Sequence, residues 1–429
     1  MASSQALPGV AVGDEAPAPG RGRAACRFCS APLEHTVVDL GMSPLCESFV
    51  RPEHANEMEP FYPLHVWVCD RCLLVQLEEY VGPDEIFTEY AYFSSFSTSW
   101  VEHARRYATQ MVERLPLFAE SLVVEVGSND GYLLQHFVER GVPVLGIEPA
   151  ANVAASAVER GIPTLVEFFG QETARRLAEE GRRADLVLGN NVLAQVPDLN
   201  DFVAGLATLL AEDGVLTLEF PHLVNLVEGN QFDTIYHEHF SYFSLLTTRA
   251  VLEAHGLQVF DVDELPTHGG SLRVYAQRQG VRRPASEAVG ALLRREEELG
   301  YATLAPYASF AARVEETKRA LLEFLIDAKR RGATIAGYGA PGKGNTLLNY
   351  CGIRTDFLDY TVDRNPYKHG LLLPGTRIPI FPPERLAETK PDYVLILPWN
   401  LRDEIVQQLR YAREWGAKFV VPIPTVEVV

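Results

Sequence analysis

Residues 122–134, with the sequence LVVEVGSNDGYLL, specify the fold class of this chain. The apolar run LVVEVG has the length and composition of a buried β-strand, and YLL begins a segment with helical patterning. Between them lies a turn of small residues that contains Gly127 and Gly131. In a doubly wound sheet, such a turn after the first strand lets the backbone approach a ligand closely. The stretch therefore predicts the first strand, turn and helix of an α/β domain.

Three further apolar runs follow this strand at intervals suited to a parallel sheet. They are PVLGIEP (143–149), ADLVLGNNV (184–192) and GVLTLEF (214–220), and segments with helical patterning separate them. Strands that alternate with helices predict a parallel α/β sheet. Residues 257–279 return to strand-like patterning, so we expect additional strands at the edge of that sheet.

A second, smaller α/β unit is expected near the C-terminus. Residues 286–331 predict two helices, and the runs ATIAGYG, LDYTVDRN, DYVLILPWN and AKFVVPIP beyond them predict four strands. The predicted organisation is a disordered leader rich in Ala, Gly and Pro (1–23), a module of loops and short strands (24–95), the first α/β domain (96–282), a helical connector (283–330) and the second α/β domain (331–429).

The composition excludes several classes of protein. Hydrophobic residues make up 47% of the 429 residues, which is far too apolar for a disordered chain. No uncharged apolar run approaches the ~18 residues of a membrane-spanning helix. The first 23 residues contain no apolar segment of a secretory signal, so we expect a cytoplasmic protein. The net charge of −19, from 38 Lys and Arg against 57 Asp and Glu, argues against a nucleic acid as partner.

Four of the six cysteines form two CxxC pairs. Cys26, Cys29, Cys69 and Cys72 follow the pattern C-x2-C-x39-C-x2-C. Each pair places two thiolates on one turn, and two such turns close a tetrahedral zinc site. Four thiolates leave no open position for catalysis, so we expect the zinc to be structural. The alternative is four reduced cysteines in a small core, and Cys46 and Cys351 are expected to be packing or pocket residues.

The carboxyl ends of the predicted strands carry residues suited to a nucleoside-containing ligand. Glu148 ends the second strand, 21 residues after Gly127, where an acidic residue suits a ribose diol. The first turn lacks the G-x-G-x-x-G pattern of NAD-binding proteins, and its E-x-G-x-x-x-G pattern resembles the S-adenosylmethionine signature of class I methyltransferases. The alternative is a tight turn without a ligand. The predicted cofactor-binding residues are Glu125, Gly127, Asn129, Asp130, Gly131, Glu148, Phe168, Asn190 and Asn191.

The segment Tyr236-His237-Glu238-His239 follows the strand that ends near residue 220. Histidine has an ordinary pKa of ~6.5, which suits acid–base chemistry near neutrality. Glu238 could orient an imidazole or hold a substrate hydroxyl, and Tyr236 could donate a hydrogen bond to a developing enolate oxygen. Two alternatives remain open: a metal site, for which no third ligand is obvious, and a structural pair of histidines.

A glycine-rich loop, GYGAPGKGNT (337–346), matches two nucleotide-binding patterns incompletely. It contains G-x-G-x-x-G and the start of a phosphate-binding loop, but Gly344 replaces the required Ser or Thr. A glycine-rich turn with Lys343 at a helix N-terminus predicts an anion-binding site, and a diphosphate is a ligand that suits such a site. Lys343 and Tyr338 are the predicted substrate-binding residues here, and a purely structural turn is the alternative.

Taken together, these motifs resemble the sugar C-methyltransferases that act at C-3 of TDP-linked 4-keto-6-deoxy sugars in antibiotic biosynthesis. The resemblance covers residues 24–425 and rests on the two CxxC pairs and on the segments PLCESF, EVGSNDGYLL, GIEPAANVA, NNVLAQVPD, FDTIYHEHFSYFS, THGGSLRVY and GYGAPGKGNT. It implies three domains: an N-terminal zinc module, a central class I S-adenosylmethionine (SAM) domain and a C-terminal Rossmann-like domain, with the sugar nucleotide between them.

The resemblance also implies roles for single residues. His239 would remove the proton at C-3, Tyr236 and Glu238 would accompany it around the sugar, and Lys343 would contact the sugar nucleotide. Tyr90 would be a further residue of the sugar pocket, and His237 is placed with the substrate-binding residues. The reaction would proceed through an enolate and in-line attack on the methyl group. We expect a TDP-linked keto-deoxysugar as substrate and a monomeric enzyme.

One departure from the family pattern concerns the sugar site. Related enzymes generally have NNVLAHVPD, and this chain has Gln195 at the histidine position. Glutamine can form hydrogen bonds but cannot transfer a proton near neutral pH. This keeps open methylation at another position or on another nucleotide-linked sugar. Two hypotheses from different classes also stay open: an NAD-dependent oxidoreductase that uses the loop at 337–342, and a non-catalytic sugar-nucleotide-binding protein.

Overall fold

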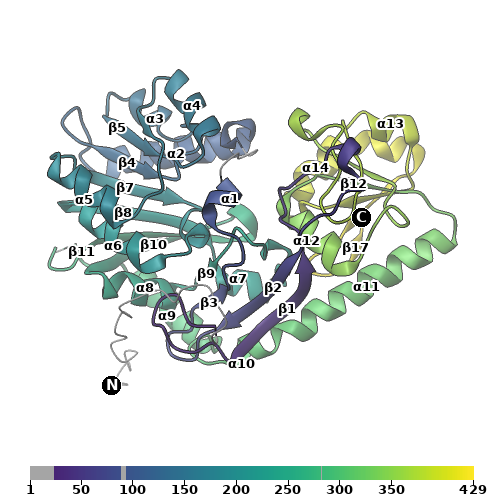
Figure 1. Ribbon diagram of the computed structural model, residues 1–429, viewed down its shortest axis with the longest axis horizontal. Helices are drawn as coiled ribbons and strands as arrows, with labels where there is room; N and C mark the ends of the chain where they lie inside the picture. Colours follow the sequence, from purple (N-terminus) through teal and green to yellow (C-terminus); the bar gives the residue numbers. More distant parts are fainter. Residues whose placement is uncertain (1–23, 88–92, 282) are drawn as a thin grey trace. The chain divides into compact units, whose positions relative to one another are not determined.

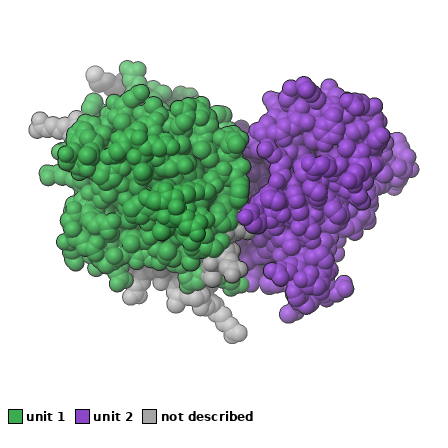
Figure 2. All heavy atoms as spheres, turned by 90° about the horizontal axis from the view of Figure 1, so that it is seen from above, with its two compact units in different colours: residues 1–35, 68–223, 238–304 green, residues 36–67, 224–237, 305–429 purple. Residues whose placement is uncertain are grey.

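A computed structural model describes residues 24–87, 93–281 and 283–429 of the chain. The predicted leader and Tyr90 lie outside the described residues. The chain forms two compact units, coloured separately in Figure 2, and each unit combines three segments of the sequence. Unit 1 contains residues 1–35, 68–223 and 238–304, and unit 2 contains residues 36–67, 224–237 and 305–429.

Unit 1 is built on a seven-stranded sheet with the strand order β10-β11-β8-β7-β4-β5-β6 (Figure 1). The pairs β4/β5, β4/β7, β5/β6 and β7/β8 are parallel, and β11 runs antiparallel to β8 and β10. The strands are β4 (Val123–Val126), β5 (Val144–Ile147), β6 (Thr164–Leu165), β7 (Ala184–Asn190), β8 (Leu210–Pro221), β10 (Leu257–Leu265) and β11 (Ser271–Arg278). Each strand predicted for this domain is confirmed, including the two edge strands.

Helices cover both faces of this sheet, as right-handed crossovers between parallel strands require (Figure 1). On one face lie α2 (Thr98–Arg114), α3 (Gln135–Val138) and α4 (Ala151–Glu159). On the other lie α5 (Gln171–Glu179), α6 (Leu199–Leu209) and α8 (Leu245–Ala254). Because both faces are covered, all four residues of β4 are buried, and three of them are valines that contribute to the apolar interior. The fourth is Glu125, an exception that marks the functional site.

The remainder of unit 1 consists of short elements and one longer helix. The two cysteine turns lie next to β3 (Val75–Leu77), which pairs antiparallel with β9 (Ser241–Tyr242). The other elements are α1 (Pro83–Phe87), η2 (Ser94–Phe96), η3 (Leu193–Gln195), η5 (Thr267–Gly269) and α9 (Glu287–Glu298). The two helices predicted over 286–331 are present as α9 and α11, with the short α10 between them.

Unit 2 contains a six-stranded sheet with the order β14-β13-β12-β15-β16-β17, in which only β17 is antiparallel. Its strands are β12 (Ile335–Tyr338), β13 (Tyr360–Val362), β14 (Ile380–Phe381), β15 (Tyr393–Ile396), β16 (Lys418–Val421) and β17 (Glu427–Val428). The chain leaves β12 toward β13 and later returns to β15 on its other side, so the order reverses at β12 and β15. This is a Rossmann-like arrangement, and it confirms the fold predicted for the C-terminal part.

Unit 2 contains α11 (Phe310–Arg330), the longest helix among the described residues (Figure 1). The others are α7 (Leu223–Glu228), whose first residue belongs to unit 1, α10 (Ala305–Ala308), α12 (Gly342–Cys351), α13 (Arg385–Thr389) and α14 (Arg402–Gln408). Short 3-10 helices are η1 (Pro52–His54), η4 (Phe232–Thr234), η6 (Pro366–Lys368), η7 (Trp399–Leu401) and η8 (Arg410–Trp415). The hairpin strands β1 (His35–Ser43) and β2 (Tyr62–Val68) each reach one residue into unit 1.

Within the described ranges, none of the helices has the length and apolar character needed to cross a membrane.

Candidate functional site

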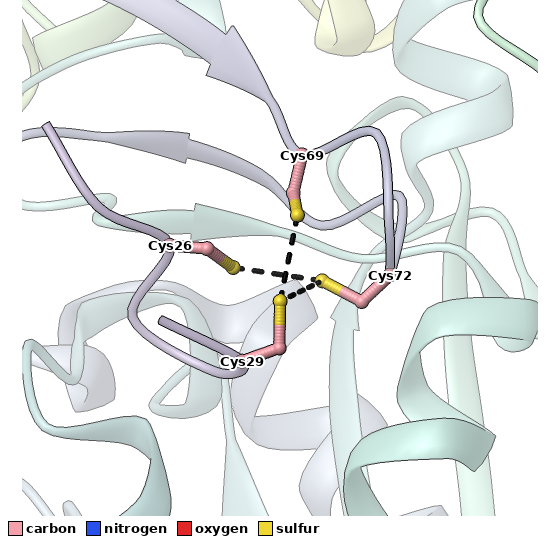
Figure 3. Close-up of side chains that lie close together, drawn as sticks. All are labelled: Cys26, Cys29, Cys69 and Cys72. Atoms are coloured by element: carbon pink, nitrogen blue, oxygen red, sulfur yellow. Dashed lines mark hydrogen bonds between the residues drawn. The ribbon is translucent and has the colours of Figure 1, made fainter. Parts of the chain in front are cut away.

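The four predicted metal ligands converge in unit 1 (Figure 3). The Sγ atoms of Cys26, Cys29, Cys69 and Cys72 all lie within 4.8 Å of one another, and Cys26 and Cys72 are separated by 3.5 Å. All four side chains are buried. Hydrogen bonds from the other three thiols lower the pKa of Cys26. The donor set and its compactness suit a tetrahedral Zn²⁺.

The two cysteine turns have the same backbone construction. The N–H of Ser30 donates to the carbonyl of Cys26 at 2.8 Å, and the N–H of Leu73 donates to that of Cys69 at 2.9 Å. The residue after the second cysteine, Ser30 or Leu73, has a positive φ of 58° or 61°. This left-handed position reverses the chain after each CxxC and turns both sulfur atoms of the pair to one side.

Arg27, between the first two cysteines, connects the metal site to the α/β domain of unit 1. Its backbone N–H donates to Gln76 Oε1 at 2.9 Å, and Gln76 Nε2 donates to Cys26 Sγ at 3.2 Å. The guanidinium donates to the carbonyls of Pro197, at 2.7 Å, and Leu77. Burial lowers the pKa of Arg27 to about 10, so the group stays charged at neutral pH. Zinc would therefore also stabilise the loop that follows Gln195.

The turn predicted to bind the cofactor lies at the carboxyl end of β4. Gly127, Asn129 and Gly131 have φ values of 68°, 49° and 77°. Glycine is required at two of these positions, because a Cβ on Gly127 would lie 3.2 Å from Val192 and one on Gly131 would collide with Ile162. Asparagine tolerates the left-handed region at position 129 better than most residues do.

Glu148, at the end of β5, fixes this turn from the neighbouring strand. Its Oε2 accepts the N–H of Asn129 and its Oε1 accepts the N–H of Ala150, both at 2.9 Å. Burial raises the pKa of Glu148 above its ordinary value, although these two hydrogen bonds oppose the shift. A carboxylate has about four lone-pair sites, so both oxygens keep capacity for ligand hydroxyls.

Glu125 is a carboxyl group with no solvent exposure inside β4. Burial raises its pKa well above the ordinary range, and the negative charges of Glu148 and Asp130 add to the effect. Neither of its oxygens has a hydrogen-bond partner among the described residues. The protonated form of Glu125 is therefore favoured relative to that of an exposed glutamate.

The carboxyl ends of the adjacent strands β4 and β7 hold a group of buried polar atoms without a partner in the described ranges. Such atoms are rare in native proteins, and each costs about 1–3 kcal/mol. Their concentration where the strand order reverses indicates a polar ligand, and SAM, with its ammonium, carboxylate and ribose hydroxyls, fits these donors and acceptors. The atoms are Glu125 Oε1 and Oε2, Ser128 Oγ, Asp130 Oδ1, Asn190 Oδ1 and Nδ2, and Asn191 Oδ1.

Segment 94–95 is fixed to the same turn. The N–H of Ser94 donates to Asn129 Oδ1 at 2.8 Å, and Arg160 lies 3.3 Å from Asp130 Oδ2 and donates to Ser95 Oγ at 3.0 Å. Phe168, which follows β6, is 44% exposed, so its ring is accessible to a ligand. Each of the nine predicted cofactor residues thus lies on or just after one of the strands β4 to β7.

The YHEH segment spans the boundary between the units, because Tyr236 and His237 belong to unit 2 and Glu238 and His239 to unit 1. Glu238 and His239 are buried, and the His239 ring packs edge-on against Tyr242 at 6.2 Å. His237 Nε2 donates to the carbonyl of Pro63 at 3.2 Å, and burial lowers its pKa. His237 therefore has a structural contact in addition to any role in substrate binding. Gln195 is half-buried at the end of η3.

In unit 2, internal carboxylates use the N–H groups of the glycine-rich loop. Asp363 Oδ2 accepts the N–H of Ala340 at 2.7 Å, and Glu47 accepts the N–H of Gly342, the first residue of α12. Lys368 Nζ lies 3.4 Å from Glu47 Oε2 and compensates its charge. The Glu47 side chain therefore occupies the position at the N-terminus of α12. A dinucleotide phosphate would need the same position.

Lys343 is half-buried next to this loop. Its Nζ donates to Asn400 Oδ1 at 2.8 Å and lies 5.0 Å from the ring of Trp399. Trp399 Nε1 in turn donates to Asp233 Oδ2 at 2.7 Å, and burial raises the pKa of Asp233 to about 6. Burial lowers the pKa of Lys343. Tyr338, at the end of β12, is buried and donates its hydroxyl to Gln408 at 3.1 Å.

The sequence analysis missed a buried ionic cluster behind the cofactor turn. Glu219 near the end of β8 contacts His103 at 2.9 Å and pairs with Arg273 on β11. Trp100 and His268 lie beside this cluster, with ring centroids 5.1 Å apart. The one signal in the sequence was His268 in the segment THGGSLRVY, where two glycines after a histidine indicate an unusual backbone.

Comparison with family models defines the class of protein. Residues 100–262 match a methyltransferase domain, residues 26–87 match a zinc binding domain, and residues 266–424 match a C-methyltransferase C-terminal domain.

Individual proteins give the same result. C-methyltransferase NovU from Streptomyces niveus is 39% identical over 404 residues, which cover 94% of this chain and 96% of NovU. The chain therefore belongs to the family of SAM-dependent C-methyltransferases, with a zinc-binding module of four cysteines.

More distant matches are limited to part of the chain. A ubiquinone biosynthesis O-methyltransferase from Methylobacterium nodulans is 37% identical over 93 residues, 21% of this chain and 36% of that protein. The structure of the magnesium protoporphyrin IX methyltransferase ChlM from Synechocystis PCC 6803 with bound SAM has a TM-score of 0.32 and 17% identity, and covers 42% of this chain and 79% of that one.

Removal of one zinc ligand should release the metal. The purified protein should contain about one zinc per chain by elemental mass spectrometry. Cys72→Ser should lower this ratio severalfold and lower Tm, because it removes a thiolate from a closed site. Cys351→Ala, at a buried cysteine of unit 2, is the control and should keep the wild-type ratio. A wild-type protein purified without chelators that contains no zinc would contradict the assignment.

The raised pKa of Glu125 predicts a pH-dependent loss of stability. Above about pH 5 the unfolded chain has released this proton and the folded chain retains it, so stability falls as pH rises, by up to about 1.4 kcal/mol per pH unit. Glu125→Gln removes this titration, so the Tm of the variant relative to wild type should increase from pH 6 to pH 8 without ligand. Glu298→Gln, at an exposed position on α9, should follow the wild type. An equal Tm difference at both pH values would mean that Glu125 is already ionised.

Proposed function

We propose that the enzyme methylates C-3 of a TDP-linked 4-keto-6-deoxy sugar by base-catalysed enolate formation and in-line methyl transfer. The observation that carries the proposal is the intact Tyr236–His239 segment, of which His237, Glu238 and His239 are buried, in a chain whose proposed donor crevice has unpaired buried polar atoms among the described residues at the ends of β4 and β7. The resemblance of the sequence motifs to C-3 methyltransferases of TDP sugars supports the substrate class, and deoxysugar modification for antibiotic biosynthesis is the corresponding biological role.

The proposed role of the donor crevice is to hold and orient the cofactor. SAM supplies an electrophilic methyl group on its sulfonium sulfur. Glu148 would accept hydrogen bonds from the ribose hydroxyls, because it lies on β5 beside the turn. Asp130 and Asn190 would pair with the charged amino-acid end, since Asp130 Oδ1 and Asn190 Oδ1 are buried and lack partners among the described residues. Alignment of reacting atoms to about 3–3.5 Å is the main contribution that the protein makes to such a transfer.

Acid–base chemistry is assigned to the YHEH segment. The 4-keto group lowers the cost of removing the neighbouring proton at C-3, and His239 would take that proton. Tyr236 would donate a hydrogen bond to the enolate oxygen, and Glu238 would hold a sugar hydroxyl or orient an imidazole. Tyr90 and Gln195 would contact the sugar, and Lys343 would contact the sugar nucleotide.

Gln195 favours a second candidate within the same class, in which another carbon or another nucleotide-linked sugar is methylated. A glutamine at this position can hold a substrate hydroxyl but cannot transfer its proton. The hydrogen-bonding arrangement of the glycine-rich loop gives no support to the NAD-dependent oxidoreductase, because Glu47 and Asp363 already use N–H groups that a dinucleotide would need.

Mass spectrometry tests the proposal. The enzyme is incubated with SAM and a panel of TDP-4-keto-6-deoxyhexoses in deuterated water. A gain of one methyl group, with loss of the exchangeable C-3 proton, is the expected result. Deuterium at C-3 without methyl gain would show a working base with the wrong acceptor. Methyl gain with the C-3 hydrogen retained would support methylation at another position, and neither event with any sugar would contradict the substrate class.

His239→Asn should abolish turnover and leave cofactor binding intact. Asparagine is similar in size but cannot take a proton, so we expect kcat to fall by about 100-fold or more. Calorimetric titration with S-adenosylhomocysteine should give a Kd within about threefold of wild type. The exposed His54 provides the control, because His54→Asn should change neither value. A near-normal kcat for His239→Asn would remove His239 from the role of base.

A further inference from the structure

We propose that His268 is a positioning residue on the acceptor side of the methyl-transfer site, where it orients the amide of Asn191. The inference rests on the proposed function, because it takes the crevice at the ends of β4 and β7 as the SAM site. Four observations within unit 1 carry it: the contact with Asn191, the backbone of the loop, the anchoring of that loop, and its place in the sheet.

The contact involves two side chains from different loops, since Asn191 follows β7 and His268 lies in η5, between β10 and β11. Asn191 Nδ2 donates to His268 Nε2 at 3.1 Å. An amide nitrogen can only donate, so this hydrogen bond requires an unprotonated Nε2 on His268. The other amide atom, Asn191 Oδ1, is buried and has no partner among the described residues. His268 therefore fixes which end of the amide stays available, and that end is a hydrogen-bond acceptor suited to a substrate hydroxyl. The inference thus moves Asn191, which the sequence predicted as a cofactor residue, to the acceptor side of the site.

Both partners have a left-handed backbone. His268 has φ of 54° and Asn191 has φ of 59°, in a region that is uncommon for residues other than glycine. Gly269 and Gly270 also have positive φ values, so three successive residues of the loop share this unusual geometry. Unfavourable backbone conformations persist only where surrounding contacts enforce them, and they are frequent at functional sites.

The surrounding contacts come from the buried Glu219. Its carboxylate accepts Thr267 Oγ1 at 3.1 Å, next to His268, and its backbone carbonyl accepts the N–H of Asn191 at 2.7 Å. One residue thus anchors both partners. Burial alone would raise the pKa of Glu219, but the hydrogen bond from His103 and the charge of Arg273 bring it below the ordinary value. The anchor is therefore an ionised group.

A row of aromatic rings connects His268 to the cofactor turn. Trp100 packs edge-on against His268 at 5.1 Å, stacks on His103 at 5.0 Å, and stacks on Tyr132 at 6.1 Å. Tyr132 directly follows Gly131. His268 thus contacts the residue that follows β7 directly, and the Trp100 ring links it to Tyr132 in the turn that follows β4.

The strand order places His268 on the acceptor side. Across the sheet the strands run β5, β4, β7, β8, β11. Glu148, the proposed ribose ligand, ends β5, so the nucleoside lies at the β5 side of the crevice. The loop with His268 leads into β11 and contacts the end of β7, beyond the turn. The acceptor has to approach from the side of β7 and β11, because the side of β5 is already assigned to the ribose of the cofactor.

The test compares His268→Gly with wild type in the methyl-transfer assay. Glycine suits a φ of 54°, so this variant removes the imidazole without adding backbone strain. We expect kcat/KM for the sugar to fall by about 30- to 100-fold, as misplacement of reacting groups does. The Kd for S-adenosylhomocysteine, from calorimetry, should stay within about threefold of wild type. His268→Gln, whose side-chain oxygen can accept from Asn191, should recover activity to within about fivefold of wild type.

Lys390→Gly is the matched control, because Lys390 has φ of 49° at an exposed position of unit 2 and should behave as wild type. If the wild type is active and His268→Gly has an unchanged kcat/KM, the inference about His268 would be overturned and the proposed function would stand. A loss of more than about tenfold in S-adenosylhomocysteine affinity would also overturn it, since His268 would then act on the donor side. A wild type that methylates no sugar of the panel would overturn the proposed function and the inference that rests on it.

Discussion

The turn from Gly127 to Gly131 organises the remainder of unit 1. Three left-handed residues bring this backbone to the carboxyl ends of β4 and β5, and Glu148 holds it there through the N–H of Asn129. The result is a group of carboxyl and amide side chains at these strand ends, several of them with buried atoms that have no partner among the described residues. Burial raises the pKa of Glu125 and Glu148, so the protein without ligand stores an electrostatic cost that binding of a cationic, hydroxyl-rich cofactor would relieve.

The zinc module extends this constraint to the loop after β7. Arg27 lies between two zinc ligands and donates to the carbonyl of Pro197, two residues after Gln195. Asn200 at the start of α6 donates to the carbonyl of Phe28 at 3.0 Å, from the other side of the same loop. A structural metal can therefore influence the predicted sugar contact at Gln195 without taking part in the chemistry.

Contacts within unit 2 fix the residues that directly precede the proposed acid–base segment Tyr236–His239. The Thr346 hydroxyl on α12 donates to the carbonyl of Ile235 at 2.9 Å, and Trp399 donates to Asp233. Tyr236 therefore follows a stretch that is held by α12, the helix of the glycine-rich loop, and by η7, which follows β15. The chain enters unit 1 between His237 and Glu238, so each unit contains two residues of the proposed catalytic segment.

The sheet, the zinc ligands and the donor turn could be predicted from the sequence, because each has a local signature. Apolar runs of four to eight residues specify buried strands, CxxC pairs specify a thiolate site, and Gly127 and Gly131 specify a left-handed turn in which a side chain would be strained. The resemblance that the motifs carry extended this to the family. Only the folded chain shows which hydrogen-bond donors and acceptors remain unpaired. The pairing of each group depends on residues that are distant in the sequence. Folding paired Asn191 with His268, gave the α12 N-terminus to Glu47, and buried Glu219 with His103 and Arg273. These contacts join segments separated by 54 to about 300 residues, and no local pattern encodes such pairs.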